Sequence, residues 1–183
     1  MRAPLAAVLV VACLVAGCGP GSGSSTVIGG VDVGKAQTLD LAKVDPAFHL
    51  ELPAPAGSQA ERGGTDTVDV HVTGDYDLTV TRLEGTSPAA VLDASKKLVA
   101  SGLFTNVAVL SSDDQSFVYR WQLPTATEPM VSFYRVIAGK RGELYRVGDG
   151  PSTAALAEGR AGKQFSEQLA RAVDDLVARA EPR

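Results

Sequence analysis

Apolar and polar side chains alternate along several short stretches of this 183-residue chain. Val68, Val70 and Val72 alternate with polar residues, and residues 116–123 carry an aromatic or aliphatic side chain at every second position. A period of two residues is typical of β-strands that bury one face. The sequence therefore predicts a domain built mainly from β-strands.

The remaining patterns indicate helices between and after the strands. The expected strands cover residues 47–52, 68–72, 78–80, 106–110, 116–123, 130–138 and 143–147. A helix is predicted from Ser87 to Gly102, because Ser87 is a favoured N-cap, Pro88 fits the first helical position and Gly102 fits the stop. An apolar stripe predicts a closing helix over 162–179. This order predicts an α+β fold, with an antiparallel β-sheet of about six to seven strands packed with two helices.

The organisation along the chain is expected to have four parts. They are an apolar N-terminal segment (1–17), Cys18 with a Gly/Ser tether (18–25), a weakly ordered arm (26–45) and a single globular domain (46–183). Gly and Ser supply no apolar surface to bury, so the tether is expected to behave as a flexible coil. Within the domain, the polar, Gly-rich residues 57–66 are expected to form a loop.

The N-terminus carries an export signal. The apolar run from Leu5 to Ala16 has 12 residues, too few to span a bilayer but typical of a signal-peptide core. Val15, Ala16 and Gly17 then precede Cys18. This sequence resembles the lipobox of bacterial lipoproteins, which implies that Cys18 is acylated with diacylglycerol and that a signal peptidase cuts just before it. The other interpretation is an ordinary signal peptide with a chance cysteine.

The lipobox resemblance implies an exported protein anchored to a membrane by lipid and facing the periplasm or the cell exterior. In a cell with two membranes, the outer membrane is expected, because Gly19 does not resemble the Asp that typically retains lipoproteins at the inner membrane. The expected partners are membrane lipid, through Cys18, and an envelope protein. Nucleic acid is excluded as a general partner, because a net charge of −4 supplies no field that attracts phosphate.

The order of predicted elements between Phe48 and Arg179 resembles the PsbP/Mog1-like fold, which also occurs in exported bacterial lipoproteins. The shared features are an opening strand near Phe48, the hairpin at 68–80, the helix at 87–102, the central strands and a closing helix at 165–177. The resemblance implies a non-catalytic binding or assembly role and transfers no functional residue.

Two motifs contain residues suited to phosphate or metal chemistry. Residues 29–35 have the G-x-x-x-x-G-K spacing of a phosphate-binding loop, but Ala36 lacks the hydroxyl that binds magnesium and Asp32 would repel an anion. Asp69 and His71 point to the same side of one strand, and Asp77 begins the partner strand. These three side chains form a candidate site for a divalent ion, whereas the simpler interpretation is the solvated face of a hairpin.

A ligand groove is the third candidate. The aromatic line at 117–121 is most simply a sheet face under a helix; alternatively, Trp121 and Tyr134 line a ligand-binding groove. Lys140, Arg141 and Arg146 form a small basic cluster near a hairpin tip, which is expected either to solubilise a turn or to contact lipid headgroups or an acidic partner.

No catalytic constellation is evident in the sequence. His49 and His71 are the only histidines, and no serine lies in a G-x-S-x-G setting. Asp113 and Asp114 are expected in a turn, and Asp174 and Asp175 on a helix surface. The sequence therefore favours a non-enzymatic binding or assembly role in the cell envelope, without a cofactor. The alternatives are a small-ligand or metal-binding module and, third, an unrecognised hydrolase.

Overall fold

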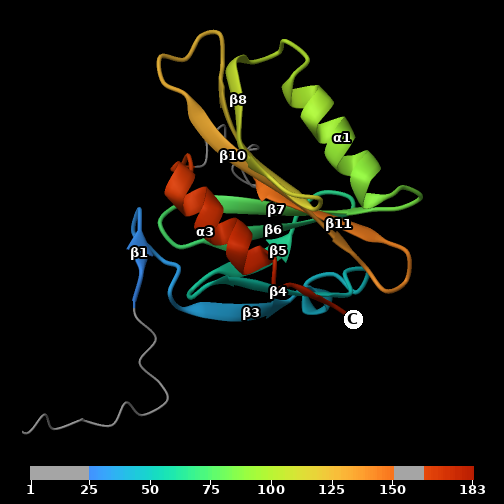
Figure 1. Ribbon diagram of the computed structural model, residues 1–183. Helices are drawn as coiled ribbons and strands as arrows, with labels where there is room; N and C mark the ends of the chain where they lie inside the picture. The colour runs from blue at the N-terminus through green and yellow to red at the C-terminus, as the bar shows by residue number, and fades with distance from the viewer. Residues whose placement is uncertain (1–24, 151–162) are drawn as a thin grey trace, which may run out of the picture.

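The computed structural model describes residues 25–150 and 163–183, and its largest element is a seven-stranded sheet (Figure 1). Its strands are β5 (Gln59–Arg62), β6 (Thr67–Val72), β7 (Tyr76–Leu83), β8 (Thr105–Ser112), β9 (Ser116–Gln122), β10 (Met130–Ala138) and β11 (Leu144–Asp149). They lie in the order β5-β6-β7-β11-β10-β9-β8, and each neighbouring pair is antiparallel. The predicted antiparallel sheet is confirmed.

Within the described residues, helices α1 (Pro88–Val99) and α3 (Glu167–Val177) pack on opposite faces of this sheet. The first helix begins as predicted, because the Ser87 side chain accepts a hydrogen bond from the backbone N–H of Ala90. The second helix is shorter than the predicted 162–179. Its start is fixed at Ser166, whose side chain accepts a hydrogen bond from the N–H of Leu169. The mixed α+β class is therefore confirmed.

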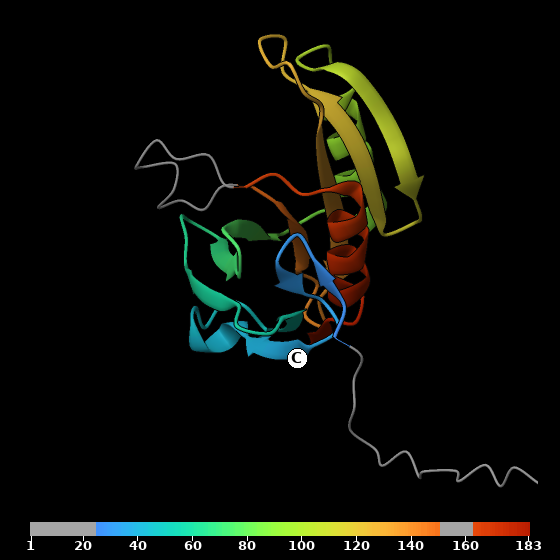
Figure 2. The same cartoon turned by 90° about the vertical axis from the view of Figure 1, so that its left-hand side faces the viewer.

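A second, smaller sheet contains β3 (Ala36–Asp40), β4 (Leu50–Pro55) and β12 (Glu181–Pro182), with β4 in the middle. In Figure 2 this sheet lies at the bottom of the molecule, while β8 and β10 rise at the top. The strand predicted at 47–52 begins only at Leu50, as β4, and it belongs to this separate sheet rather than to the main one. The loop predicted at 57–66 contains strand β5, which pairs with β6.

Residues 26–45 are ordered in the structure, in contrast to the expected weakly ordered arm. They form the hairpin β1 (Val27–Ile28) and β2 (Val31–Asp32), strand β3 and the 3₁₀ helix η1 (Leu41–Lys43). The physical reason is burial, since Val31 and Leu41 are fully buried in the main core. The contacts that order this segment come from distant parts of the chain, so its local pattern does not predict them.

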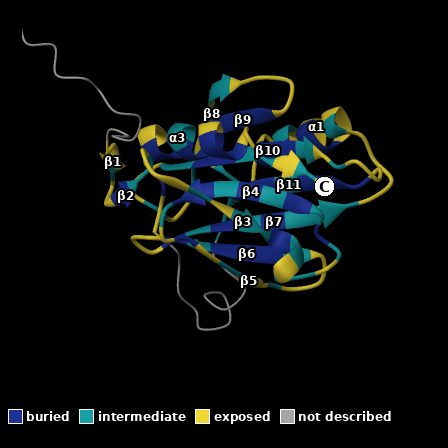
Figure 3. Cartoon of the chain, turned by 90° about the horizontal axis from the view of Figure 1, so that it is seen from below, coloured by how far each residue is buried: buried dark blue, intermediate teal, exposed yellow. Residues whose placement is uncertain are grey.

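The core has two parts, one on each face of the main sheet. Figure 3 shows β6 and β9 as largely buried. The larger part lies between the two sheets and around α3, where Leu169 and Val173 pack with Phe133. The smaller part lies under α1, where Leu92 packs with Tyr119. Neighbouring residues of β9 and β10 therefore serve opposite cores, as the two-residue period predicts.

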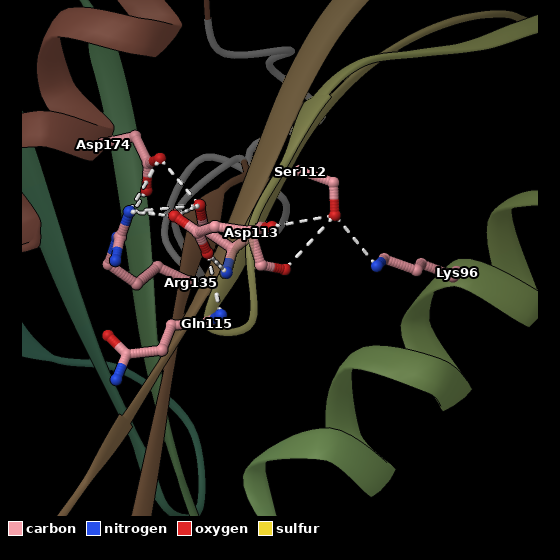
Figure 4. Close-up of polar contacts among 7 residues, drawn as sticks. Lys96, Ser112, Asp113, Gln115, Arg135 and Asp174 are labelled. Carbon is pink, nitrogen blue, oxygen red and sulfur yellow. Dashed lines mark hydrogen bonds and ion pairs between the residues drawn. The ribbon is translucent and has the colours of Figure 1, made fainter.

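A buried ion pair ties α3 to the sheet (Figure 4). The Arg135 guanidinium donates to both carboxylate oxygens of Asp174, with Nε–Oδ1 at 2.7 Å and Nη2–Oδ2 at 3.0 Å. The hydroxyl of Ser116 donates to Asp174 and accepts from Arg135. Asp174 was expected on the exposed surface of its helix, and this expectation is wrong: 7% of Asp174 and 6% of Arg135 is exposed.

The same network reaches the turn between β8 and β9, where Asp113 lies 3.5 Å from Arg135. Burial alone would raise the pKa of Asp113. Hydrogen bonds from the backbone N–H groups of Gln115 and Ser116, together with the charge of Arg135, outweigh burial and lower this pKa. On the other side of this turn, the Lys96 ammonium of α1 donates to the Ser112 hydroxyl at 2.9 Å. One turn therefore contacts charged groups from both faces of the sheet (Figure 4).

We predict that Asp174→Ala lowers the free energy of unfolding by about 3–5 kcal/mol, because the buried Arg135 guanidinium loses its bidentate carboxylate partner. Asp175→Ala is the matched control, since it removes an exposed charge at the next position. The control is expected to change the same free energy by less than about 1 kcal/mol. Urea denaturation measures both variants. Equal losses in the two would contradict the assignment.

Candidate functional site

A cavity of about 280 Å³ lies between the C-terminal end of α1, the sheet and the segment that precedes α3. Its described lining residues are Asp77, Leu98, Val99, Phe104, Tyr119, Trp121, Ser132, Tyr134, Asp149, Gly150, Lys163, Gln164 and Phe165. Most of them are apolar or aromatic, and the few polar groups lie among them. This composition is typical of small-molecule sites, and the volume is near the lower end of their usual range.

The sheet supplies the aromatic wall. Tyr119 lies directly opposite Ser132 in the β9–β10 ladder. On the same face, Trp121 is the diagonal neighbour of Ser132 and Tyr134 is the diagonal neighbour of Tyr119. The Tyr119 and Tyr134 rings stack with centroids 5.8 Å apart, and Phe104 meets Trp121 edge-on at 4.5 Å. The structure therefore brings together the two residues, Trp121 and Tyr134, that the sequence indicates as a groove. The expected packing of this face under a helix is also found, because α1 covers Tyr119.

Gly148 allows Tyr134 to lie close against β11. The two residues are direct partners in the β10–β11 ladder. A Cβ atom at position 148 would lie 2.6 Å from Cδ1 of the Tyr134 ring, a separation that non-bonded carbon atoms do not adopt. The absence of a side chain at this position therefore fixes where this part of the cavity wall lies.

Asp149 brings a carboxyl group into the aromatic cavity. Its Oδ1 accepts from the backbone N–H of Phe133 and its Oδ2 from the hydroxyl of Ser132, both at 2.8 Å. The Ser132 hydroxyl in turn accepts from Nε1 of Trp121, also at 2.8 Å. Burial raises the pKa of Asp149 to about 6, although these hydrogen bonds act in the opposite direction. Asp149 as a whole is half-buried, and it is among the residues that line the cavity.

Burial also raises the pKa of the Tyr119 phenol, and the nearby Tyr134 and the Asp149 carboxylate act in the same direction. Tyr119 therefore stays neutral at physiological pH. A neutral phenol beside a buried carboxyl group can donate or accept hydrogen bonds but adds no charge to the cavity.

The candidate metal ligands are arranged differently from the prediction. His71 Nδ1 lies 2.7 Å from Asp77, and its Nε2 lies 3.0 Å from Glu61 of β5. Asp69 is 1% exposed and accepts a hydrogen bond from Thr79 instead. The hairpin is not the edge of the sheet either, because β5 pairs with β6.

Both nitrogens of His71 thus face carboxylates. Burial opposes protonation, but the contacts with Glu61 and Asp77 outweigh it and raise the pKa of His71. The protonated ring has no lone pair for a metal ion. In the described ranges, 25–150 and 163–183, no group of three or more His, Cys, Asp and Glu side chains is arranged to hold one.

The other sequence candidates do not form a common site. Residues 29–35 lie on and after the β1–β2 hairpin, where Asp32 pairs with Lys35 at 3.5 Å. The basic cluster is divided, because Arg141 contacts His49 at 2.9 Å whereas the Arg146 guanidinium lies over the Tyr134 ring at 5.5 Å. Cys18 lies outside the described residues.

Asp149 and Ser132 were missed by the sequence analysis. Asp149 lies between two glycines, a pattern that resembles a turn, and Ser132 looks like any polar residue of an alternating strand. The signal that does identify them is three-dimensional, namely the register that places Ser132 beside the end of β11.

We predict that Asp149→Asn stabilises the fold at neutral pH. The pKa of this carboxyl rises from 3.8 to about 6 on folding. Between these pH values the folded state binds more protons than the unfolded state, so that wild-type stability falls as pH rises. The variant lacks this titration and is expected to gain about 1–3 kcal/mol relative to the wild type between pH ~4 and pH ~8. Urea denaturation across this range measures the difference, and a difference that is independent of pH would contradict it.

The comparisons with known proteins leave the site to be interpreted from its geometry. No protein-family model matches the sequence, and no curated protein matches it significantly. Among residues 25–150 and 163–183, no helix has the length and apolar character needed to cross a membrane. The cavity beside Trp121, Tyr134 and Asp149 is therefore the main evidence on function.

Proposed function

We propose that this chain is an exported lipoprotein, tethered to a membrane through Cys18, whose domain binds a small ligand in the aromatic cavity without catalysing a reaction. The observation that carries the ligand-binding proposal is the cavity of about 280 Å³, with Trp121, Tyr134 and Tyr119 in its wall and Asp149 among them. A concave apolar site with a few fixed polar groups is the usual form of a small-molecule site.

The location rests on the sequence of residues 1–18. The length of the apolar run and the small residues before Cys18 support lipid attachment. Two or more acyl chains give durable anchoring. The Gly/Ser-rich residues 19–25 then supply a reach of roughly 15 Å, which places the domain just off the lipid surface. The order of elements from Phe48 onward, with one helix on each face of an antiparallel sheet, supports a PsbP/Mog1-like arrangement.

A second candidate function is binding to an envelope protein. Strand β8 is at one edge of the main sheet, and its Val109 side chain is 55% exposed. Leu98 and Leu103, at the end of α1 and just beyond it, are 54% and 61% exposed. Exposed apolar side chains and open strand edges favour contacts with other chains. The assembly role implied by the resemblance would use this surface.

Anchoring is tested by Cys18→Ser. We expect this variant to leave the membrane fraction and appear in the soluble fraction, because the acceptor thiol for lipid is gone. Cys13→Ser is the matched control, since Cys13 lies within the signal-peptide core and is expected to be removed with it. Fractionation and detergent phase partitioning report the location. If the Cys18 variant partitions like the wild type, the anchor is refuted.

Ligand binding is tested with benzyl alcohol, a small neutral aromatic probe. Trp121 is the single tryptophan of the chain, so its emission and its indole N–H resonance report on the cavity alone. We expect benzyl alcohol to perturb both signals, and Tyr134→Ala to weaken its binding about tenfold through the loss of an aromatic wall. Leu103→Ala is the control, because it removes an exposed apolar side chain that does not line the cavity. An unperturbed Trp121 at millimolar probe would overturn the proposed site.

A further inference from the structure

The charged groups of the cavity differ in how they are paired. Three described lining residues carry a charged side chain at neutral pH: Asp77, Asp149 and Lys163. Asp77 is paired with His71 at 2.7 Å, and the Lys163 ammonium lies over the Tyr76 ring at 5.0 Å. In the part of the chain that the structure describes, Asp149 has no basic side chain within ion-pair distance. Among the described residues, the cavity therefore contains one carboxyl group that has no basic side chain beside it.

The hydrogen bonds around Asp149 are oriented to support a negative charge. Trp121 donates to the Ser132 oxygen, so the hydroxyl proton of Ser132 is directed to the Asp149 carboxylate. The backbone N–H of Phe133 donates to the other carboxylate oxygen. Each carboxylate oxygen has two acceptor positions, and one protein donor on each leaves acceptor capacity for a ligand.

The wall of the cavity suits a positive charge as well. Aromatic faces attract cations through their negative quadrupole, most strongly for Trp and then for Tyr. In this protein Arg146 already lies over Tyr134, and Lys96 lies over Phe117 at 5.6 Å. Trp121 and Tyr119 line the same cavity as Asp149.

We infer that the ligand is a small organic cation, with a compact ammonium group at Asp149 and an apolar body against Trp121 and Tyr119. This inference rests on the proposed function. The volume of about 280 Å³ favours a compact molecule over an extended one. An anionic ligand is disfavoured, because it would be repelled by the Asp149 carboxylate. A hard metal ion is disfavoured too, because it requires several oxygen ligands. Among the described residues that line the cavity, Asp149 is the one carboxylate without a basic partner.

The test compares choline with 3,3-dimethylbutan-1-ol, which has the same shape but carries a neutral carbon in place of the ammonium nitrogen. Each is titrated into the wild-type protein, and the Trp121 indole N–H resonance is followed. We expect choline to bind at least about tenfold more tightly than the neutral probe, because a desolvated cation gains from both the aromatic faces and the carboxylate.

Asp149→Asn removes the charge and keeps an oxygen that accepts from Phe133. We expect the preference for choline to fall to within about twofold in this variant, whereas benzyl alcohol still binds. Asp114→Asn is the matched control, because it removes an exposed carboxylate that does not line the cavity, and its preference should equal that of the wild type.

The outcomes separate this inference from the proposed function. If benzyl alcohol perturbs Trp121 but choline binds no more tightly than its neutral counterpart, the inference is overturned and the ligand site stands. The inference is likewise overturned if Asp149→Asn keeps the full preference for choline. If none of the three probes perturbs Trp121, both the inference and the proposed function fail.

Discussion

The position of α3 depends on one buried charge. Arg135 points from β10 toward the helix, and an unpaired guanidinium in that place would cost several kcal/mol. Asp174 of α3 supplies the bidentate carboxylate partner, and Asp113 of the β8–β9 turn lies 3.5 Å away. Phe165, just before the helix, then pairs with Val131 at the edge of β10 and lines the cavity. The ion pair on one face of the sheet thus determines where part of the cavity wall lies.

The two faces of β9 and β10 pack against different parts of the protein, because successive side chains of a strand point to opposite faces. Val118 and Phe133 pack toward α3 and the second sheet, whereas Tyr119 and Tyr134 pack toward α1 and the cavity. A shift of one residue in the β9–β10 register would exchange these sets. The large aromatic side chains would then occupy the space of α3, so the same packing that stabilises the core also keeps the cavity residues in place.

The sequence predicts those features that depend on neighbouring residues. The alternation at 68–72 and 116–122, the Ser87 cap and the antiparallel sheet all follow from local patterns. Trp121 and Tyr134 are indicated as groove residues by their aromatic character, whereas their shared face depends on the β9–β10 register. Features that depend on distant contacts were not predicted. Arg135 looks exposed on an alternating strand, since nothing near it in sequence indicates Asp174. Likewise, residues 26–45 are ordered because Leu41 packs into a core that is formed by distant parts of the chain.

The small sheet has a consequence for how the chain folds. Strand β4 pairs on one side with β3, which precedes it closely, and on the other with β12, where Glu181 lies opposite Glu51. Closing that second edge joins segments separated by most of the domain, and such non-local pairing is slow to form. The hairpin of β6 and β7 needs only a short loop closure. Folding is therefore expected to begin in local hairpins and to end with β12, which leaves the edge of β4 open in late intermediates.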